Sequence, residues 1–198
     1  MKQLQAHVRG QVQKGVLEGR SPEHEEQKII EKMSEFTFVG HSGPVYSTSI
    51  MLDDKYMVSG SHDCTIRLWS LLSRQCLVVY QTHQMPVWSV RFSPLGYHFA
   101  SASNDRTACV FDMRQHTPVR IFAGHLADVT AVEWHPNCLY IATGSSDCQL
   151  RIWSVETGEC ERAMFTCESA VRSLKFTRAG LHLFAGNDQG QFVLFDVQ

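Results

Sequence analysis

The stretch "FAGHLADVTAVEWHPNCLYIATGSSDCQLRIWS" (residues 122–154) decides the fold, because its pattern returns along the chain. It contains three short segments rich in β-forming residues, "VTAVEWH", "YIATGS" and "QLRIWSV", and a fourth, "CERAMFT", follows. Turn-forming groups separate them: "HPN", "SSDC" and "ETGE". The stretch therefore predicts a unit of four short strands.

Three kinds of residue recur with one spacing of 42 positions. They are the histidines His41, His83 and His125, the aspartates Asp63, Asp105 and Asp147, and the aromatics Trp69, Phe111, Trp153 and Phe195. The next steps of the first two series fall on Cys167 and Gln189. Three independent markers with one period indicate a repeat architecture of four units.

Four strands per period, with Gly-His near the start and a tryptophan ending the third strand, resemble the blade of a WD-repeat β-propeller. We expect an all-β chain with four recognisable blades that form part of a larger, typically seven-bladed ring. The units are expected over residues 36–75, 76–117, 118–159 and 160–198, the last being the most eroded. "FTFVGH" matches "VVYQTH" and "RIFAGH", which predicts an outer strand over Phe36–Val39.

Residues 1–35 lack the repeat and carry six basic and six acidic side chains. Ser21 as an N-cap and Pro22 at the first helical position favour a short helix over residues 21–33. A flexible polar arm is the alternative. The sequence thus predicts an N-terminal arm, disordered or helical, before the propeller region at 36–198.

The composition is that of an ordinary soluble protein, with 43% hydrophobic residues and a net charge of −2. We expect no membrane segment, since no apolar run approaches about 18 residues. Seven cysteines without a C-x-x-C pair or a secretory leader indicate a reducing compartment. The charge balance gives no reason to expect nucleic-acid binding.

A hydroxyl precedes each of the first three aromatics by ten residues, and alanine takes this place in the fourth unit. The resemblance to WD repeats implies a hydrogen-bonded line from Trp through Ser/Thr and His to Asp. The implied structural sets are His41, Ser59, Asp63 and Trp69; His83, Ser101, Asp105 and Phe111; and His125, Thr143, Asp147 and Trp153. In the fourth unit Cys167, Ala185, Gln189 and Phe195 replace the whole line.

The same groups in unit after unit favour a structural brace over a catalytic site, which needs one assembled constellation. A metal site is not expected either, because the histidines lack ligand spacing and the pairs Cys64/Cys148 and Cys76/Cys160 follow the repeat. We therefore expect no enzyme activity, no catalytic or metal-binding residues, no cofactor and no small-molecule substrate.

Three stretches carry a more specific resemblance: "GHSGPVYS" (40–47), "PVWSVRFSPLGYHFAS" (86–101) and "PVRIFAGHLADVTAVEWHPNCLYIATGSSD" (118–147). They are similar to the WD-repeat TATA-binding-protein-associated factor family, the fifth TFIID subunit and its SAGA-type paralogue. The likeness covers residues 36–198 and is weak in the fourth unit. It implies a nuclear scaffold subunit for RNA polymerase II transcription whose propeller packs against histone-fold subunits.

The chain lacks the LisH and helical dimerisation regions of that family and several blades. We expect it to be a fragment, a short isoform or an incomplete gene model.

Partner contacts are expected on the top rim, beside the Gly-His and Asp turns, without direct sequence-specific nucleic-acid binding. The rim positions are Pro44, Tyr46, His62, Pro86, Trp88, Asn104, Asp128, Thr130 and Ser146. Tyr46 and Trp88 are the expected anchors, and packing between blades is the alternative for both. A ubiquitin-ligase substrate receptor, the competing WD-repeat function, would show a ring of rim arginines, of which the sequence offers Arg172.

Overall fold

The computed structural model describes residues 36–165 and 169–197. The chain divides into two compact units, residues 1–38 and 39–198. In the first unit the described part contains Phe36 and Phe38, whose rings meet edge to face with centroids 5.5 Å apart. The arm or helix expected over residues 1–35 lies outside the described residues. Every strand reported below belongs to the second unit.

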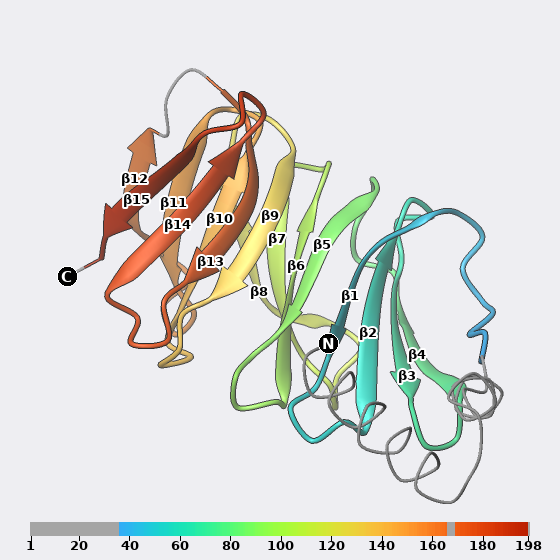
Figure 1. The fold of residues 1–198 in the computed structure, drawn as a ribbon. Coiled ribbons are helices and arrows are strands. Elements are labelled where there is room, and N and C mark those ends of the chain that lie inside the picture. The colour runs from blue at the N-terminus through green and yellow to red at the C-terminus, as the bar shows by residue number, and fades with distance from the viewer. Residues whose placement is uncertain (1–35, 166–168, 198) are drawn as a thin grey trace, which may run out of the picture. The chain divides into compact units, whose positions relative to one another are not determined.

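The second unit consists of four antiparallel sheets that follow one another along the chain (Figure 1). The first sheet contains β1 (Val45–Ile50), β2 (Tyr56–Ser61), β3 (Ile66–Ser70) and β4 (Gln75–Tyr80). The second contains β5 (Val87–Phe92), β6 (His98–Ser103), β7 (Thr107–Asp112) and β8 (Pro118–Ala123).

The third sheet contains β9 (Val129–Trp134), β10 (Tyr140–Ser145), β11 (Gln149–Ser154) and β12 (Cys160–Phe165). The fourth contains β13 (Val171–Phe176), β14 (His182–Asn187) and β15 (Phe192–Asp196). In each sheet the strands pair in chain order. The described residues contain no helix, and none of their segments is a helix long and apolar enough to cross a membrane. The all-β fold with four blades is confirmed.

The apolar core lies between consecutive sheets. Tyr80, at the end of β4, packs its ring against Phe99 of β6 and Phe111 of β7, with centroids 5.1 and 5.2 Å apart. Phe122 of β8 contacts Trp153 of β11 in the same way, at 5.5 Å. Each of the three core clusters takes side chains from two neighbouring sheets. A sheet of this kind therefore needs its neighbour to bury its apolar face.

Close approach of the sheets depends on small residues in the second strand of each blade. A Cβ atom at Gly144 of β10 would lie 2.9 Å from the Cβ atom of Val171 on β13. At Gly60 of β2 the corresponding distance to the Cβ atom of Val87 would be 3.3 Å. The repeat therefore has a glycine or alanine at the position against which the first strand of the next sheet packs.

The prediction of an outer strand over Phe36–Val39 is wrong, because residues 36–44 form no strand. A strand needs a hydrogen-bonded neighbour, and no ladder of the described residues includes this segment. The sequence units and the sheets are also offset by one strand. The outer strand that opens each later unit, such as β4, pairs into the preceding sheet before the chain crosses to the next blade.

We expect Tyr80→Ala to lower the free energy of unfolding by about 3–5 kcal/mol, because it removes a ring buried between two sheets. Leu126→Ala is the matched control, since that side chain is 74% exposed. Chemical denaturation followed by tryptophan fluorescence measures both. Equal losses in the two variants would contradict a core located between the sheets.

Candidate functional site

The first blade contains an unbroken line of side-chain hydrogen bonds. Trp69 Nε1 donates to Ser59 Oγ at 2.8 Å, and Ser59 Oγ lies 2.7 Å from His41 Nε2. His41 Nδ1 lies 2.8 Å from Asp63 Oδ2. The line thus joins β3, β2, the loop before β1 and the β2–β3 turn.

The third blade repeats this line with a threonine. Trp153 Nε1 donates to Thr143 Oγ1 at 2.8 Å, Thr143 Oγ1 lies 2.8 Å from His125 Nε2, and His125 Nδ1 lies 2.9 Å from Asp147 Oδ2. Because the indole donates to the hydroxyl, the hydroxyl donates to Nε2 and the neutral imidazole donates from Nδ1. Burial lowers the pKa of His125, and this effect outweighs the neighbouring Asp147 carboxylate, which raises it. The lowered pKa favours the same neutral form of the imidazole.

The second and fourth blades depart from the pattern. In the second, His83 bonds Ser101 and Asp105, each at 2.7 Å, while Phe111 offers no donor and stacks on Phe99 at 4.9 Å.

The fourth blade has Ala185 buried, Phe195 half-buried and Gln189 exposed, and Cys167 lies outside the described residues. Its β14–β15 turn is held by Asn187 Oδ1, which accepts from the amides of Gln189 and Gln191. In this blade, hydrogen bonds within one turn replace the line of hydrogen bonds between distant residues.

The aspartates fasten two loops together. Asp63 Oδ2 accepts from the amide of Ser42, and Asp63 Oδ1 accepts from the amide and hydroxyl of Thr65 at 3.0 and 2.7 Å. The residue after each aspartate adopts a positive φ, as at Cys64 (66°) and Cys148 (65°). Those two cysteines therefore occupy one repeated turn position.

All three aspartates are held in the charged form. Burial opposes this, but hydrogen bonds from His83 and Thr107 outweigh it and lower the pKa of Asp105 to about 2. The pKa of Asp63 lies well below its usual range because the bonds from Thr65 and His41 outweigh burial. The pKa of Asp147 is also lowered, since the Leu126 amide and His125 outweigh burial.

These groups do not form a reactive centre. Ser59, Ser101 and Thr143 are at most 3% exposed, and each hydroxyl is bound to its histidine. A nucleophile must reach a substrate, and these hydroxyls face the interior of a sheet. In the part of the chain that the structure describes, no group of three or more His, Cys, Asp or Glu side chains could hold a metal ion.

A β-bulge near the start of the first strand of each sheet sets the direction of the rim side chains. The register skips one residue in β1, β5, β9 and β13. The skipped residues are Tyr46, Trp88, Thr130 and Arg172. A bulge often changes the direction of a side chain next to a functional site. The four skipped residues occupy one repeated position at the rim, and their residue type differs from blade to blade.

Tyr46 and Trp88 form an aromatic pair at the rim. Their ring centroids are 4.7 Å apart, and the ring of His62 lies 6.2 Å from that of Tyr46. Tyr46 is 43% exposed, whereas Trp88 is half-buried. The indole nitrogen of Trp88 is buried without a hydrogen-bond partner among the described residues. Pro44 beside this pair is exposed.

The other expected rim residues are less accessible. Pro86 is buried, because the turn folds over it and its carbonyl accepts from Ser103 Oγ and the Asn104 amide. Thr130 is buried because its hydroxyl donates to the carbonyls of Gly144 and Val171. Neither side chain offers a contact surface.

Asn104, Asp128 and Ser146 remain half-buried at the rim, where the Ser146 amide donates to the Asp128 carbonyl.

The sequence analysis named Arg172 as a rim arginine but predicted none of the ion pairs that the structure shows. Arg172 forms a two-pronged ion pair with Asp188, at 2.6 and 2.7 Å. Glu133 of β9, whose side chain is 9% exposed, lies 2.5 Å from Lys175 of β13 and 3.4 Å from Arg91 of β5. Arg91, Glu133 and Lys175 are spaced by 42 residues, so the repeat register itself contained the signal.

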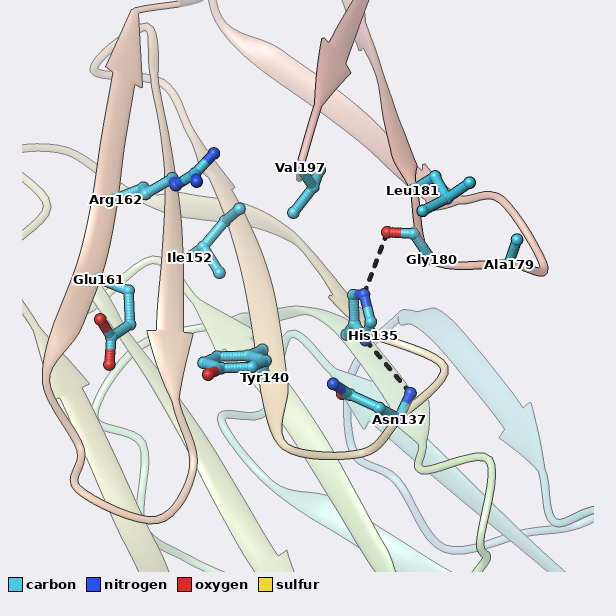
Figure 2. A pocket seen from close by; sticks show the side chains of 10 residues that line it. All are labelled: His135, Asn137, Tyr140, Ile152, Glu161, Arg162, Ala179, Gly180, Leu181 and Val197. Carbon is cyan, nitrogen blue, oxygen red and sulfur yellow. Dashed lines mark hydrogen bonds between the residues drawn. The ribbon is translucent and has the colours of Figure 1, made fainter.

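A cavity of about 420 Å³ lies between the third and fourth sheets (Figure 2). His135, Tyr140, Glu161, Arg162 and Leu181 line it. His135 Nδ1 accepts from the Asn137 amide at 3.2 Å, so its Nε2 donates to the Gly180 carbonyl at 3.1 Å. Because both ring nitrogens are engaged, this histidine is not available as a general base.

Comparison with known proteins identifies the repeat. Residues 33–70, 74–112 and 116–154 match the family model described as "WD domain, G-beta repeat". The chain is 46% identical over 69 residues, 35% of its length, to "Transcription initiation factor TFIID subunit 5" of Encephalitozoon cuniculi. It is 35% identical over 160 residues, 81% of its length, to the protein of that name in Caenorhabditis elegans.

A further similarity, 48% over 42 residues or 21% of the chain, is to "SAGA complex/transcription factor TFIID complex subunit Taf5" of Schizosaccharomyces pombe, of which 6% is matched. The chain spans 12% of the Encephalitozoon relative and 24% of the Caenorhabditis relative. The resemblance to TFIID subunit 5 that the sequence suggested is confirmed.

We expect Asp147→Ala to lower the free energy of unfolding by about 2–4 kcal/mol, because it leaves the buried His125 Nδ1–H and two turn amides without an acceptor. Gln189→Ala, at the equivalent position of the fourth blade, removes an exposed side chain and is the matched control. Thermal melts of both variants test this. Equal shifts would show that the line does not brace the blade.

We expect stability to fall as the pH drops from about 4 to about 2. The folded-state pKa of Asp105 is about 2 and its unfolded value is near 3.9, so the unfolded chain takes up protons first. The stabilisation is complete above the unfolded pKa and is lost as pH falls through the folded one. Melts between pH 7 and pH 2 should show a smaller drop for Asp105→Asn; an unchanged drop would contradict the assignment.

Proposed function

The chain belongs to the WD domain, G-beta repeat family, and from that premise we propose that it is a protein-interaction scaffold of a TFIID-type complex in RNA polymerase II transcription initiation. The proposal rests on one observation above the others: Tyr46 and Trp88 form an aromatic pair at the rim, whereas the His, Ser and Asp side chains of the line beside them are bound to one another. The similarity to TFIID subunit 5 supports the choice of this complex.

The aromatic pair has the properties of an interface anchor. Tyrosine and tryptophan supply much of the binding energy in protein interfaces, because each combines a large apolar area with a polar tip. The buried Trp88 N–H has no hydrogen-bond partner among the described residues. His62 and Pro44 extend the same surface.

A scaffold role also agrees with how the titratable groups are used. The histidines of the lines, and His135 in the cavity, have both ring nitrogens in hydrogen bonds. We therefore assign no catalytic residue, metal or cofactor to this chain. A nuclear location agrees with the transcription-initiation role in the relatives' names. As partners we propose histone-fold subunits of the same complex, which the sequence resemblance implies.

Membership of a SAGA-type complex is the finer alternative, favoured by the relative whose printed name includes both complexes. The ubiquitin-ligase adaptor is less supported. Of the four bulge positions only Arg172 is an arginine, and Asp188 already binds it through both carboxylate oxygens.

We expect the double variant Tyr46→Ala/Trp88→Ala to lose co-purification with TFIID subunits, because it removes both anchors. Affinity purification of the tagged chain from nuclear extract, followed by mass spectrometry, measures this and also separates TFIID from SAGA subunits. Recovery of the same histone-fold subunits by the double variant would remove the rim from the proposal.

Two further variants separate binding from folding. Tyr46→Arg places a charge at a partly exposed rim position and should weaken recovery, with a melting temperature close to that of the unmodified chain. Leu72→Arg is the control, since that side chain is 92% exposed in the distant β3–β4 turn and should leave recovery unchanged.

A further inference from the structure

Three dipeptides in the sequence place a serine or threonine directly before a proline: Ser21-Pro22, Ser93-Pro94 and Thr117-Pro118. Proline-directed protein kinases phosphorylate the hydroxyl of such a pair, and many of them prefer a lysine or arginine three residues after it. Arg120 holds this position for Thr117, whereas His24 and Gly96 hold it for the other two. The residue types therefore favour Thr117 over the two serines.

Thr117 is accessible in the structure. It lies in the turn between β7 and β8, where the side chains of residues 114–117 are all exposed. No hydrogen bond joins the Thr117 hydroxyl to another described residue. A hydroxyl must reach the phosphoryl donor to act as a nucleophile, and this one is free to do so.

The backbone around Thr117 is extended and borders solvent. Pro118 restricts the residue before it to extended conformations, and it opens the strand β8. Among the described strands β8 pairs with β7 alone, so its other edge is unpaired. Val119 and Ile121 are 36% and 56% exposed along this strand. Because kinases bind their substrate segment in an extended form, this segment can be bound without unfolding the blade.

Arg120 is held by hydrogen bonds that a kinase can replace. Its Nη1 and Nη2 atoms donate to the carbonyls of Val119 and Glu156, at 2.9 and 2.6 Å, on the exposed surface. A carboxylate of the kinase would form stronger, charge-assisted hydrogen bonds with the same guanidinium. Glu156 is exposed, so its released carbonyl would be solvated by water.

Ser93 is closed to a kinase in the folded chain. It is 4% exposed, and its Oγ donates to Cys138 Sγ and accepts from the Leu95 amide, each at 3.3 Å. Cys138 belongs to the β9–β10 loop of the third sheet, so Ser93 is enclosed between two sheets. A phosphate would not fit there without separating the loops. The same kind of dipeptide is thus accessible at Thr117 and inaccessible at Ser93.

We propose that Thr117 is a phosphorylation site for a proline-directed protein kinase. The kinase transfers the γ-phosphoryl group of a nucleoside triphosphate. The bond between the γ-phosphorus and the β,γ-bridging oxygen breaks, and a bond from Thr117 Oγ1 to the phosphorus forms. The hydroxyl proton passes to the base of the kinase, and the nucleoside diphosphate leaves with the electrons of the broken bond. The product adds about −1.5 to −2 charges to the turn.

The new phosphate shares its turn with a cation. The guanidinium of Arg114 lies over the ring of Tyr97, 5.3 Å from the ring centroid. A phosphate beside an arginine gains charge-assisted hydrogen bonds, which order a loop. The β7–β8 turn is at the end of the blade opposite the β6–β7 turn that carries Asp105. Phosphorylation therefore changes the charge of this end and leaves the Tyr46–Trp88 pair at the rim untouched.

Incubation of the full 198-residue chain with magnesium, ATP and a purified cyclin-dependent kinase, which is proline-directed, tests the proposal. Tandem mass spectrometry locates the phosphate. We expect it on Thr117 and not on Ser93. Thr117→Ala should abolish this phosphorylation, whereas Thr117→Ser should retain it, because it keeps the hydroxyl.

Three variants show which feature the kinase recognises. Pro118→Ala should lower the rate of phosphorylation by about tenfold or more, because it removes the residue that defines the site. Arg120→Gln should lower it by roughly fivefold, since it removes a charge-assisted contact. Arg114→Gln is the matched control and should leave the rate unchanged. Thermal melts should show that all three variants are folded.

An unmodified Thr117, phosphate confined to Ser21, or equal incorporation at Ser93 would each overturn the proposal. Loss of phosphorylation in Arg114→Gln but not in Pro118→Ala would overturn it too, because it would indicate a kinase directed by arginine. None of these results depends on TFIID partners. The phosphorylation site can therefore fail while the rim interface stands, and the reverse.

Discussion

Each sheet of this protein buries its apolar side chains against the next sheet, and the rest of the structure depends on that contact. The ring of Tyr80 is the clearest example, since it packs edge to face against the stacked rings of Phe99 and Phe111 of the next sheet. Because burial of apolar area is the main stabilising term in folding, a single blade of this kind is not an independent unit.

Apolar packing alone does not fix how the loops of a blade are arranged, and the buried hydrogen-bonded lines do this. In the third blade the line runs from Trp153 to Asp147, and its carboxylate also holds the amides of Leu126 and Gln149. A buried polar group is costly unless every member of its network is paired, so a complete line specifies one loop arrangement. The fourth blade has no such line, and its β14–β15 turn is held locally by Asn187.

The sequence predicted the strands of each blade and the groups in the lines, because both recur with the period of the repeat. It did not predict which rim side chains are accessible. Thr130 and Trp88 occupy equivalent positions, yet the hydroxyl of Thr130 is drawn into the next sheet while the indole of Trp88 stays near the surface. The strand expected at Phe36–Val39 failed for a related reason, since its pattern is that of an outer strand but no neighbour pairs with it.

Periodicity determined the fold class, the number of units and the repeated His, hydroxyl and Asp positions, whereas the wording of three stretches carried the family resemblance. These follow from local pattern, since a side chain that must face a particular neighbour in every blade recurs at every period. The tertiary structure decided the offset between units and sheets, the burial of Pro86 and Thr130, and the ion pairs of Glu133. Those features depend on which sheet, if any, lies alongside, and a repeated sequence is the same whether or not a neighbour is present.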